Sequence, residues 1–282
     1  MDTIVTPAAL QLQPDPNIPE LQAPADWHCI EFISDLHLHP SDPATFEAWR
    51  GYMAQTTASA VFILGDLFEL WAGDDIAVLA GEGLTFEAQC LTLLIQATRQ
   101  RPVFFMHGNR DFLVGSAFSD RTQVPLLADP TVLCFGGARV LLSHGDALCL
   151  DDGDYQRFRT EVRTEAWKIQ FLAKPRPERL AIARHIRTVS EGKKQGLPVG
   201  YGSDLDATAV NDWLTRANAS TLLHGHTHRP ATHALEKGRQ RMVLSDWDLT
   251  ARPPRAQVLR WNLEPTTSTH RAVPRFERVN LA

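Results

Sequence analysis

The chain has 282 residues, enough for one large domain or two small ones, and 44% of them are hydrophobic, an ordinary share for a globular protein. Its net charge of −5 argues against bulk attraction to nucleic acid, so no nucleic-acid partner is expected. There is no run of about eighteen apolar residues and no basic segment followed by an apolar one at the start. We therefore expect a cytoplasmic protein without a membrane-spanning helix or a secretory signal.

The first 26 residues contain five prolines among Gln, Asp and Ala. Proline removes a backbone donor and fixes φ, so residues 1–26 are predicted to form a disordered leader. The folded domain is expected to span residues 27–270. Residues 271–282 are expected to form a C-terminal tail.

From Trp27 onward, short apolar runs alternate with helical patterns. Strand, loop, helix and strand in succession indicate βαβ units, in which ligands gather beyond the carboxyl ends of the strands. Short hairpin-like strands later in the chain indicate mixed pairing, so we predict an α/β sandwich of two sheets with a site at one edge. Strands are predicted at 28–34, 60–65, 102–106, 131–135, 138–143, 220–223, 231–236, 241–245 and 256–262, and helices at 43–57 and 84–100.

The rhythm changes at about residues 154–203, where the pattern is helical and basic. Eleven Lys and Arg stand against four acidic residues between 157 and 194. A Lys-Pro-Arg-Pro run at 174–177 is predicted to split the segment into two helices. We interpret the segment as a helical cap inserted over the strand-end site. Its apolar side chains either line a lipid groove or pack against the protein itself, and they are Phe158, Trp167, Phe171 and Leu172.

Seven side chains that can bind metal follow the predicted strands: Asp35, His37, Asp66, Asn109, His144, His226 and His228. Oxygen and imidazole donors without a thiolate suit Mn, Fe, Co, Zn or Ni. Two-metal hydrolytic sites share a carboxylate between the ions, and Asp66, alone at the end of a central strand, is the predicted bridge. Asp35 and His37 are two residues apart in a segment predicted to be extended, so both side chains are expected to lie on one face. The same holds for His226 and His228.

Each block has a less specific interpretation when it is taken alone. An Asp after a strand is commonly a helix N-cap, and an Asn after Gly is commonly a turn residue. The metal interpretation depends on the joint order D-x-H, GD, GNRD, HGD and HGHTH, each block after an apolar run.

This order of blocks resembles the calcineurin-like metallophosphoesterase superfamily, which implies an αββα sandwich of two mixed sheets. Within it, the chain resembles the UDP-2,3-diacylglucosamine pyrophosphatases from about residue 29 to 262, in FISDLHLHP, ILGDLFELWAGDD, MHGNRDFLVG, LSHGDALCLDD and LHGHTHRPATH. The resemblance implies two divalent metal ions, with Mn²⁺ as the metal. One ion would bind Asp35, His37, Asp66 and His228. The other would bind Asp66, Asn109, His144 and His226.

The implied reaction is attack of metal-activated water on the α-phosphorus of UDP-2,3-diacylglucosamine. It gives UMP and 2,3-diacylglucosamine 1-phosphate in lipid A biosynthesis. The implied catalytic residues are Arg110, Asp66 and Asn109. Arg110 stands where most of the superfamily has His, and because a guanidinium keeps its proton, it is expected to stabilise phosphate charge. The implied substrate-binding residues are Asn109, Arg110, Asp152, Ser190 and His226. Lys193 and Lys194 lie where the chain departs from the group and are left outside the site.

Such a substrate implies peripheral attachment to the inner face of the inner membrane, and no protein partner is inferred. The main alternative is another calcineurin-like phosphodiesterase or nucleotide pyrophosphatase that acts on a soluble substrate. The basic and apolar helical insertion argues against it, because a small soluble substrate does not need one. A non-catalytic interaction protein would be expected to have lost ligands, and all seven are present.

Overall fold

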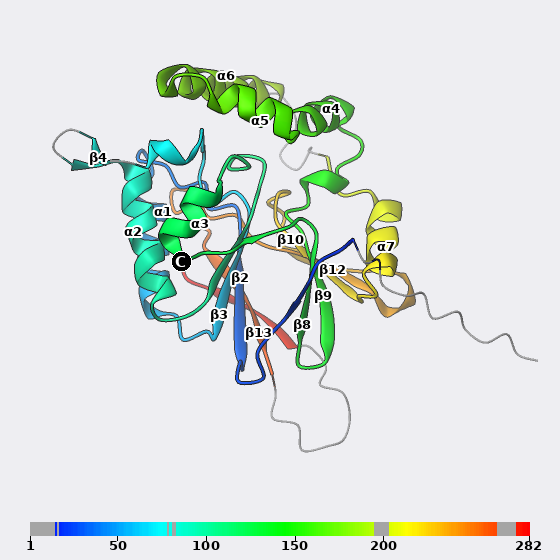
Figure 1. Cartoon of the computed structure of the whole chain (residues 1–282). Coiled ribbons are helices and arrows are strands. Elements are labelled where there is room, and N and C mark those ends of the chain that lie inside the picture. The colour runs from blue at the N-terminus through cyan, green and yellow to red at the C-terminus, as the bar shows by residue number, and fades with distance from the viewer. Residues whose placement is uncertain (1–14, 16, 78, 81–82, 195–202, 264–274) are drawn as a thin grey trace, which may run out of the picture.

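The computed structural model describes residues 15, 17–77, 79–80, 83–194, 203–263 and 275–282. Within them, two six-stranded sheets stack face to face, with helices on both outer faces and three further helices over one end (Figure 1). This is the predicted αββα sandwich of two mixed sheets. No helix in the described parts of the chain combines the length and apolarity needed to cross a bilayer.

The first sheet has the strand order β14-β13-β2-β3-β6-β7. Its strands β2, β3, β6 and β7 run parallel, so their carboxyl ends meet at one edge, whereas β13 and β14 are antiparallel to their neighbours. The bounds are β2 Cys29–Ile33, β3 Ala60–Leu64, β6 Val103–Met106, β7 Leu126–Leu127, β13 Gln257–Asn262 and β14 Arg275–Asn280.

The second sheet has the order β1-β8-β9-β10-β12-β11. Its strands β9, β10 and β12 are parallel, and β8 and β11 run antiparallel to β9 and β12. The bounds are β1 Glu20–Gln22, β8 Thr131–Phe135, β9 Ala138–Leu142, β10 Thr221–His224, β11 Ala231–Ala234 and β12 Gln240–Val243. A separate small hairpin joins β4 Leu79–Ala80 to β5 Gly83–Leu84.

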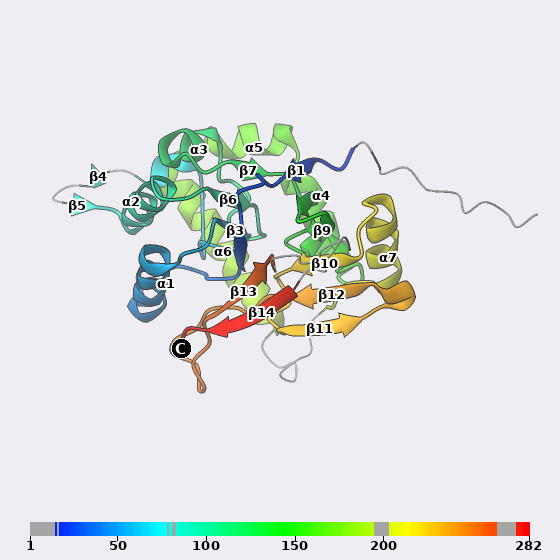
Figure 2. The same cartoon turned by 90° about the horizontal axis from the view of Figure 1, so that it is seen from below.

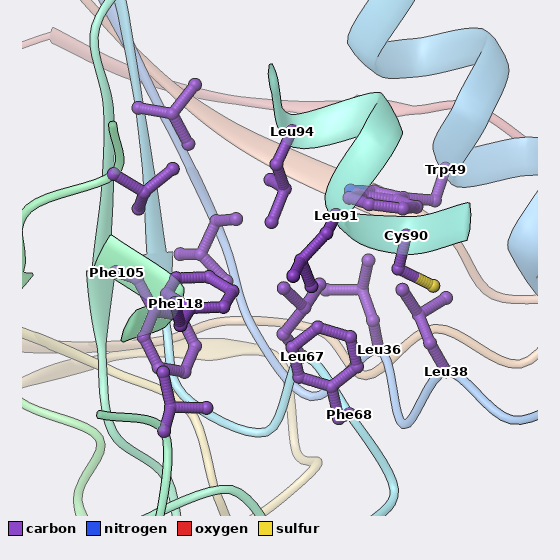
Figure 3. Close-up of a cluster of buried hydrophobic side chains, with 14 of the residues drawn as sticks. Leu36, Leu38, Trp49, Leu67, Phe68, Cys90, Leu91, Leu94, Phe105 and Phe118 are labelled. Atoms are coloured by element: carbon purple, nitrogen blue, oxygen red, sulfur yellow. The ribbon is translucent and has the colours of Figure 1, made fainter. Parts of the chain in front are cut away.

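Helices cover both outer faces, and local capping residues begin them. Asp42 accepts a hydrogen bond from the Thr45 amide at the start of α1, and Thr85 accepts one from Ala88 at the start of α2. Side chains of α1 and α2 point toward the first sheet and the loops beyond it (Figure 3). The bounds are α1 Pro43–Gln55, α2 Phe86–Thr98 and α3 Ser116–Thr122 on the first sheet, and α7 Ala207–Arg216 on the second.

The central strand β3 is buried on both faces, as its unbroken apolar run predicts. Ala60, Phe62 and Leu64 face the core between the two sheets. Val61 and Ile63 face the core under the helices. Strand β3 therefore gives the residues that follow it a rigid support.

Two predictions at the ends of the domain were wrong. The predicted disordered leader contains β1, which pairs with β8, and Ile18 beside it is buried. The predicted C-terminal tail contains β14, which pairs with all six residues of β13. Strand β14 lies beside β11 and β12 of the other sheet (Figure 2). Its Arg278 donates hydrogen bonds to the Ala231 and Val243 carbonyls there. Both strands are short and polar, so their order comes from backbone pairing with residues distant in the chain.

The insertion forms three helices rather than the predicted two: α4 Gly153–Val162, α5 Glu165–Leu172 and α6 Arg176–Lys194. The additional break falls at Thr164, whose hydroxyl accepts a hydrogen bond from the Trp167 amide and begins α5. Residues 195–202 of the predicted insertion lie outside the described residues. We refer to α4, α5 and α6 together as the cap, which lies over one end of the sandwich (Figure 1).

Two of the predicted groove residues pack against the protein itself. Phe171 is 4% exposed and belongs to the core beneath the helices, and Trp167 stacks on it with ring centroids 4.7 Å apart. Leu172 is exposed. The alternative that these side chains pack against the protein is therefore correct for Trp167 and Phe171.

We expect Phe62→Ala to lower the free energy of unfolding by about 3–5 kcal/mol, because it leaves a cavity between the two sheets. Phe62 is fully buried and stacks on Phe104 with centroids 4.7 Å apart. Urea unfolding followed by circular dichroism measures the change. As a control, Leu281→Ala removes an exposed side chain and should shift the value by no more than about 0.5 kcal/mol. Equal effects of the two substitutions would contradict the assigned core.

Candidate metal centre

The seven predicted ligands come together at the edge where parallel strands of both sheets end. Asp35 follows β2, Asp66 follows β3, His144 follows β9, and His226 follows β10. Ligand atoms of Asp35, His37 and His228 lie within 4.8 Å of one another, and so do those of Asp35, Asp66 and His144. Residues far apart in the chain thus form a single cluster of oxygen and nitrogen donors.

The first group of donors is Asp35, His37, Asp66 and His228. His37 Nε2 lies 3.3 Å from His228 Nε2, and His228 Nε2 lies 3.3 Å from Asp35 Oδ1. Asp66 Oδ2 lies 3.9 Å from His37 Nε2. Two imidazole nitrogens facing each other beside two carboxylates fit a divalent cation placed among them.

The second group is centred on the amide oxygen of Asn109. This Oδ1 lies 3.2 Å from His144 Nε2 and 2.8 Å from His226 Nδ1. Asp66 Oδ2 lies 3.7 Å from His144 Nε2, so this one oxygen is within 4 Å of a nitrogen in each group. That position suits the bridging role predicted for Asp66. Asp35, which belongs to both compact clusters, is a second candidate for a shared ligand.

The backbone at Asp35–His37 and at His226–His228 is not extended, so the prediction of extended segments there was wrong. Non-glycine residues with positive φ are uncommon and are concentrated at functional sites. Eight occur in the described part of the chain, and five of them are predicted ligands. These five are Asp35 (φ 55°), His37 (φ 49°), Asp66 (φ 52°), His226 (φ 67°) and His228 (φ 54°). The side chains of each pair converge because the backbone turns sharply, not because they share one face of a strand.

Glycines beside the ligands allow this close packing. A Cβ added at Gly108 would overlap the Asp66 carboxylate, and one added at Gly225 would overlap Asp35 and Ser34. Gly65, at φ 90°, faces the His144 ring in the same way. The glycines of the GD, GN and HGH blocks are therefore required by the space that the ligands occupy.

Burial and mutual charge shift the ionisation of the ligands. Burial alone would raise the pKa of Asp35, but His228, His144 and His37 hold it below its usual range. Burial alone would lower the pKa of His144, and the carboxylates of Asp66 and Asp35 raise it to about 9. For His226, burial and the neighbouring His144 lower the pKa to about 3. Buried carboxylates thus need positive charge beside them, which divalent ions can supply in place of protons.

Two buried acids that support the site were not predicted as functional residues. Asp111 accepts hydrogen bonds from the backbone N–H groups of Asp66 (3.3 Å), Phe68 (3.3 Å) and Gly108 (2.8 Å), and so joins two ligand loops. Asp146 accepts hydrogen bonds from Tyr155 Oη at 2.5 Å and Arg159 Nε at 2.8 Å. Their signal was present in the sequence, since they are the acids of GNRD and HGD.

The predicted substrate residues of the cap differ in position. Asp152 is exposed and begins α4 by accepting a hydrogen bond from the Tyr155 amide at 3.0 Å. Tyr155 then stacks on the His226 ring, with centroids 6.2 Å apart. Ser190 lies in α6, and its side chain is outside the described part of the structure.

Arg110 lies beside the ligands without being one of them. Its backbone N–H donates to Asp66 Oδ1 at 2.8 Å. Its guanidinium, 17% exposed, lies 3.7 Å from Glu69 Oε1. This contact draws the side chain toward the site, where the resemblance places a group that neutralises phosphate charge.

We expect Gly225→Ala to weaken Mn²⁺ binding, because the added methyl group would push the Asp35 carboxylate from its position. Isothermal titration of the chelator-treated chain measures the affinity. Gly51→Ala is the matched control, since Gly51 lies in α1 with nothing within 4 Å of an added Cβ. Equal Mn²⁺ affinity of the two variants would contradict the assigned position of Asp35.

Comparison with known proteins agrees with the five blocks. Residues 30–230 match the family model described as calcineurin-like phosphoesterase. A relative from Chromobacterium violaceum is 46% identical over 225 residues, covering 77% of this chain and 90% of its own length. Relatives from Bordetella pertussis and Xanthomonas campestris pv. campestris are 43% and 41% identical over 228 and 227 residues, covering 79% and 77% of this chain and 87% and 90% of theirs. All three are named UDP-2,3-diacylglucosamine hydrolase. The chain belongs to the calcineurin-like phosphoesterase family.

Proposed function

We propose that this chain hydrolyses the pyrophosphate bond of UDP-2,3-diacylglucosamine and releases UMP and 2,3-diacylglucosamine 1-phosphate, a step of lipid A synthesis. The observation that carries the proposal is that all seven predicted ligands lie together at one edge. The names of the relatives, UDP-2,3-diacylglucosamine hydrolase, support the same reaction. A soluble substrate is not favoured, because the cap beside the ligands has no evident use for one.

The donor set fits two divalent cations. Asp35, His37, Asp66 and His228 would hold one ion, and Asp66, Asn109, His144 and His226 would hold the other. When bound, such ions lower the pKa of a coordinated water and neutralise phosphate oxygens. We assign Mn²⁺ to both positions, as the resemblance implies, and the mixture of carboxylate, amide and imidazole is compatible with it.

Arg110 supplies a permanent positive charge. Because its guanidinium does not lose its proton near neutrality, it binds the phosphate oxygens and does not transfer a proton. Donors already in place where negative charge develops stabilise a transition state, since they need not reorganise. Asn109, directly before Arg110, places its amide oxygen between the two histidines of the second ion.

The cap contributes the lipid part of the binding site. A cavity of about 130 Å³ lies between α6 and the ligand loops. Leu38, Phe68, Leu70 and Leu180 are among its lining residues, and Arg184 and Arg187 add positive charge. We assign this cavity to part of an acyl chain, with Asp152 and Ser190 of the cap as contacts to the sugar and acyl groups.

The same cap suggests how the chain reaches a lipid substrate. Ile169 and Leu172 of α5 are large apolar side chains that are 68% and 42% exposed on a segment rich in basic residues. We propose that this face attaches the chain peripherally to the inner face of the inner membrane. Each nearby Lys or Arg would contribute about 1 kcal/mol at an anionic surface.

We expect Asp66→Ala to lower the rate of UMP release at least about 100-fold with the fold retained, because both ions lose a ligand. The assay follows UMP from UDP-2,3-diacylglucosamine with Mn²⁺, and with EDTA as the metal-free arm. Asp120→Ala, which removes an exposed acid of α3, is the control. Turnover of a soluble phosphodiester but not of the lipid nucleotide would favour the alternative function.

We expect Arg110→Ala to lower kcat about 100- to 1000-fold, since it removes one donor to the phosphate. The metal content, measured by elemental analysis of the purified chain, should stay that of the wild type. Arg50→Ala, whose side chain is 56% exposed on α1, is the control. Loss of metal from the Arg110 variant would assign it a structural role instead.

A further inference from the structure

Glu69 is a buried acid that none of the sequence blocks identified as functional. It follows β3 three residues after Asp66 and is 8% exposed. Its two oxygens face three basic groups. Oε2 lies 2.9 Å from His37 Nδ1, and Oε1 lies 2.9 Å from Arg187 Nε and 3.7 Å from Arg110. Although burial alone would raise the pKa of Glu69, these neighbours hold it below its usual range.

Glu69 contacts the ring nitrogen of His37 that does not face the other predicted ligands. His37 Nε2 is directed toward His228 and Asp66, at 3.3 and 3.9 Å. Its Nδ1 lies 2.9 Å from Glu69 Oε2 on the other side of the ring. A carboxylate behind the second nitrogen of a metal-binding histidine fixes the tautomer and the ring orientation, and raises the basicity of the first nitrogen. Glu69 is placed to do this for His37.

The contact with Arg187 joins the same carboxylate to the cap. Arg187 lies on α6, eight residues beyond Arg179, which is 3% exposed. Arg179 pairs with Asp75 and donates to the Ala72 carbonyl, so it attaches α6 to the loop after β3 at a point away from the ligands. Arg187 attaches the helix close to the predicted ligands, through Glu69, which contacts His37. It also lines the cavity beneath α6.

We propose that Glu69 is a positioning residue that couples the cap to the metal centre: one oxygen orients the His37 ring, and the other holds α6 over the site. The proposal rests on the two-metal function above. Because such coupling is reciprocal, ion binding through His37 stabilises the position of α6, and a displaced α6 weakens ion binding. A purely structural ion pair between Glu69 and Arg187 would have neither effect.

The first experiment measures metal affinity directly. Glu69→Gln keeps the size of the side chain and removes its charge. Titration of the chelator-treated chain with Mn²⁺ should show one of two sites weakened about 10- to 100-fold and the other changed less than about twofold. Glu47→Gln is the matched control, because Glu47 is an exposed acid that pairs with Arg50 on α1. Wild-type affinity at both sites in Glu69→Gln would overturn the proposal.

The second experiment measures the cap. Hydrogen exchange of the α6 backbone, read at residues 180–188 by mass spectrometry, should slow when Mn²⁺ is added to the wild type. This protection should disappear in Glu69→Gln and in Arg187→Gln. It should persist in Arg184→Gln, which changes an exposed residue of the same helix. Exchange in α6 that does not respond to Mn²⁺ in the wild type would overturn the coupling.

Two variants keep the test decisive if one does not fold. Should Glu69→Gln fail to fold, undiminished Mn²⁺ protection of α6 in Arg187→Gln overturns the proposal by itself. Neither readout uses the substrate. Binding of two Mn²⁺ with the expected protection, but no UMP release from the lipid nucleotide, would therefore contradict the proposed function and support the coupling.

Discussion

Burial of charge at the ends of parallel strands is the constraint on which the site depends. Asp35 and Asp66 are almost completely removed from solvent, and such carboxylates are stable only with positive partners and hydrogen bonds. The backbone N–H of His226 and the Ser34 hydroxyl donate to Asp35, and the backbone N–H of Arg110 donates to Asp66. These hydrogen bonds leave a need for positive charge beside the carboxylates. The four histidines meet it when they are protonated, and divalent ions meet it when they are bound.

The cap belongs to the same electrostatic system. Asp146, two residues after His144, accepts hydrogen bonds from Tyr155 and Arg159 of α4. Glu69, beyond Asp66, faces Arg187 of α6. Helices α4 and α6 of the cap are thus attached through acids that lie close in sequence to the predicted ligands His144 and Asp66. The basic excess of the insertion therefore has a use inside the protein, in addition to the membrane-surface role proposed above.

The predicted strands agree with the structure where local pattern and tertiary environment coincide. The unbroken apolar run of β3 is buried on both faces, and the polar residue after it emerges at the sheet edge. The local pattern gave a wrong prediction for β1 and β14 at the edges of the sheets, because pairing with distant strands makes these segments strands. Pattern left the surroundings of Trp167 and Phe171 open, because helical spacing does not tell which surface an apolar face will contact.

Taken alone, the order of the blocks predicted the donor set, since an apolar run followed by Asp, Asn or His indicates both a strand and the polar side chain at its end. Only the tertiary structure decided how these donors meet. The turn that brings Asp35 beside His37 needs positive φ at both residues, a conformation that Asp and His adopt more often than most residues but keep only where the surrounding structure holds it. The link from His37 through Glu69 to Arg187 likewise joins residues of different elements, with Glu69 and Arg187 more than a hundred positions apart, and periodicity within one element carries no information about such contacts.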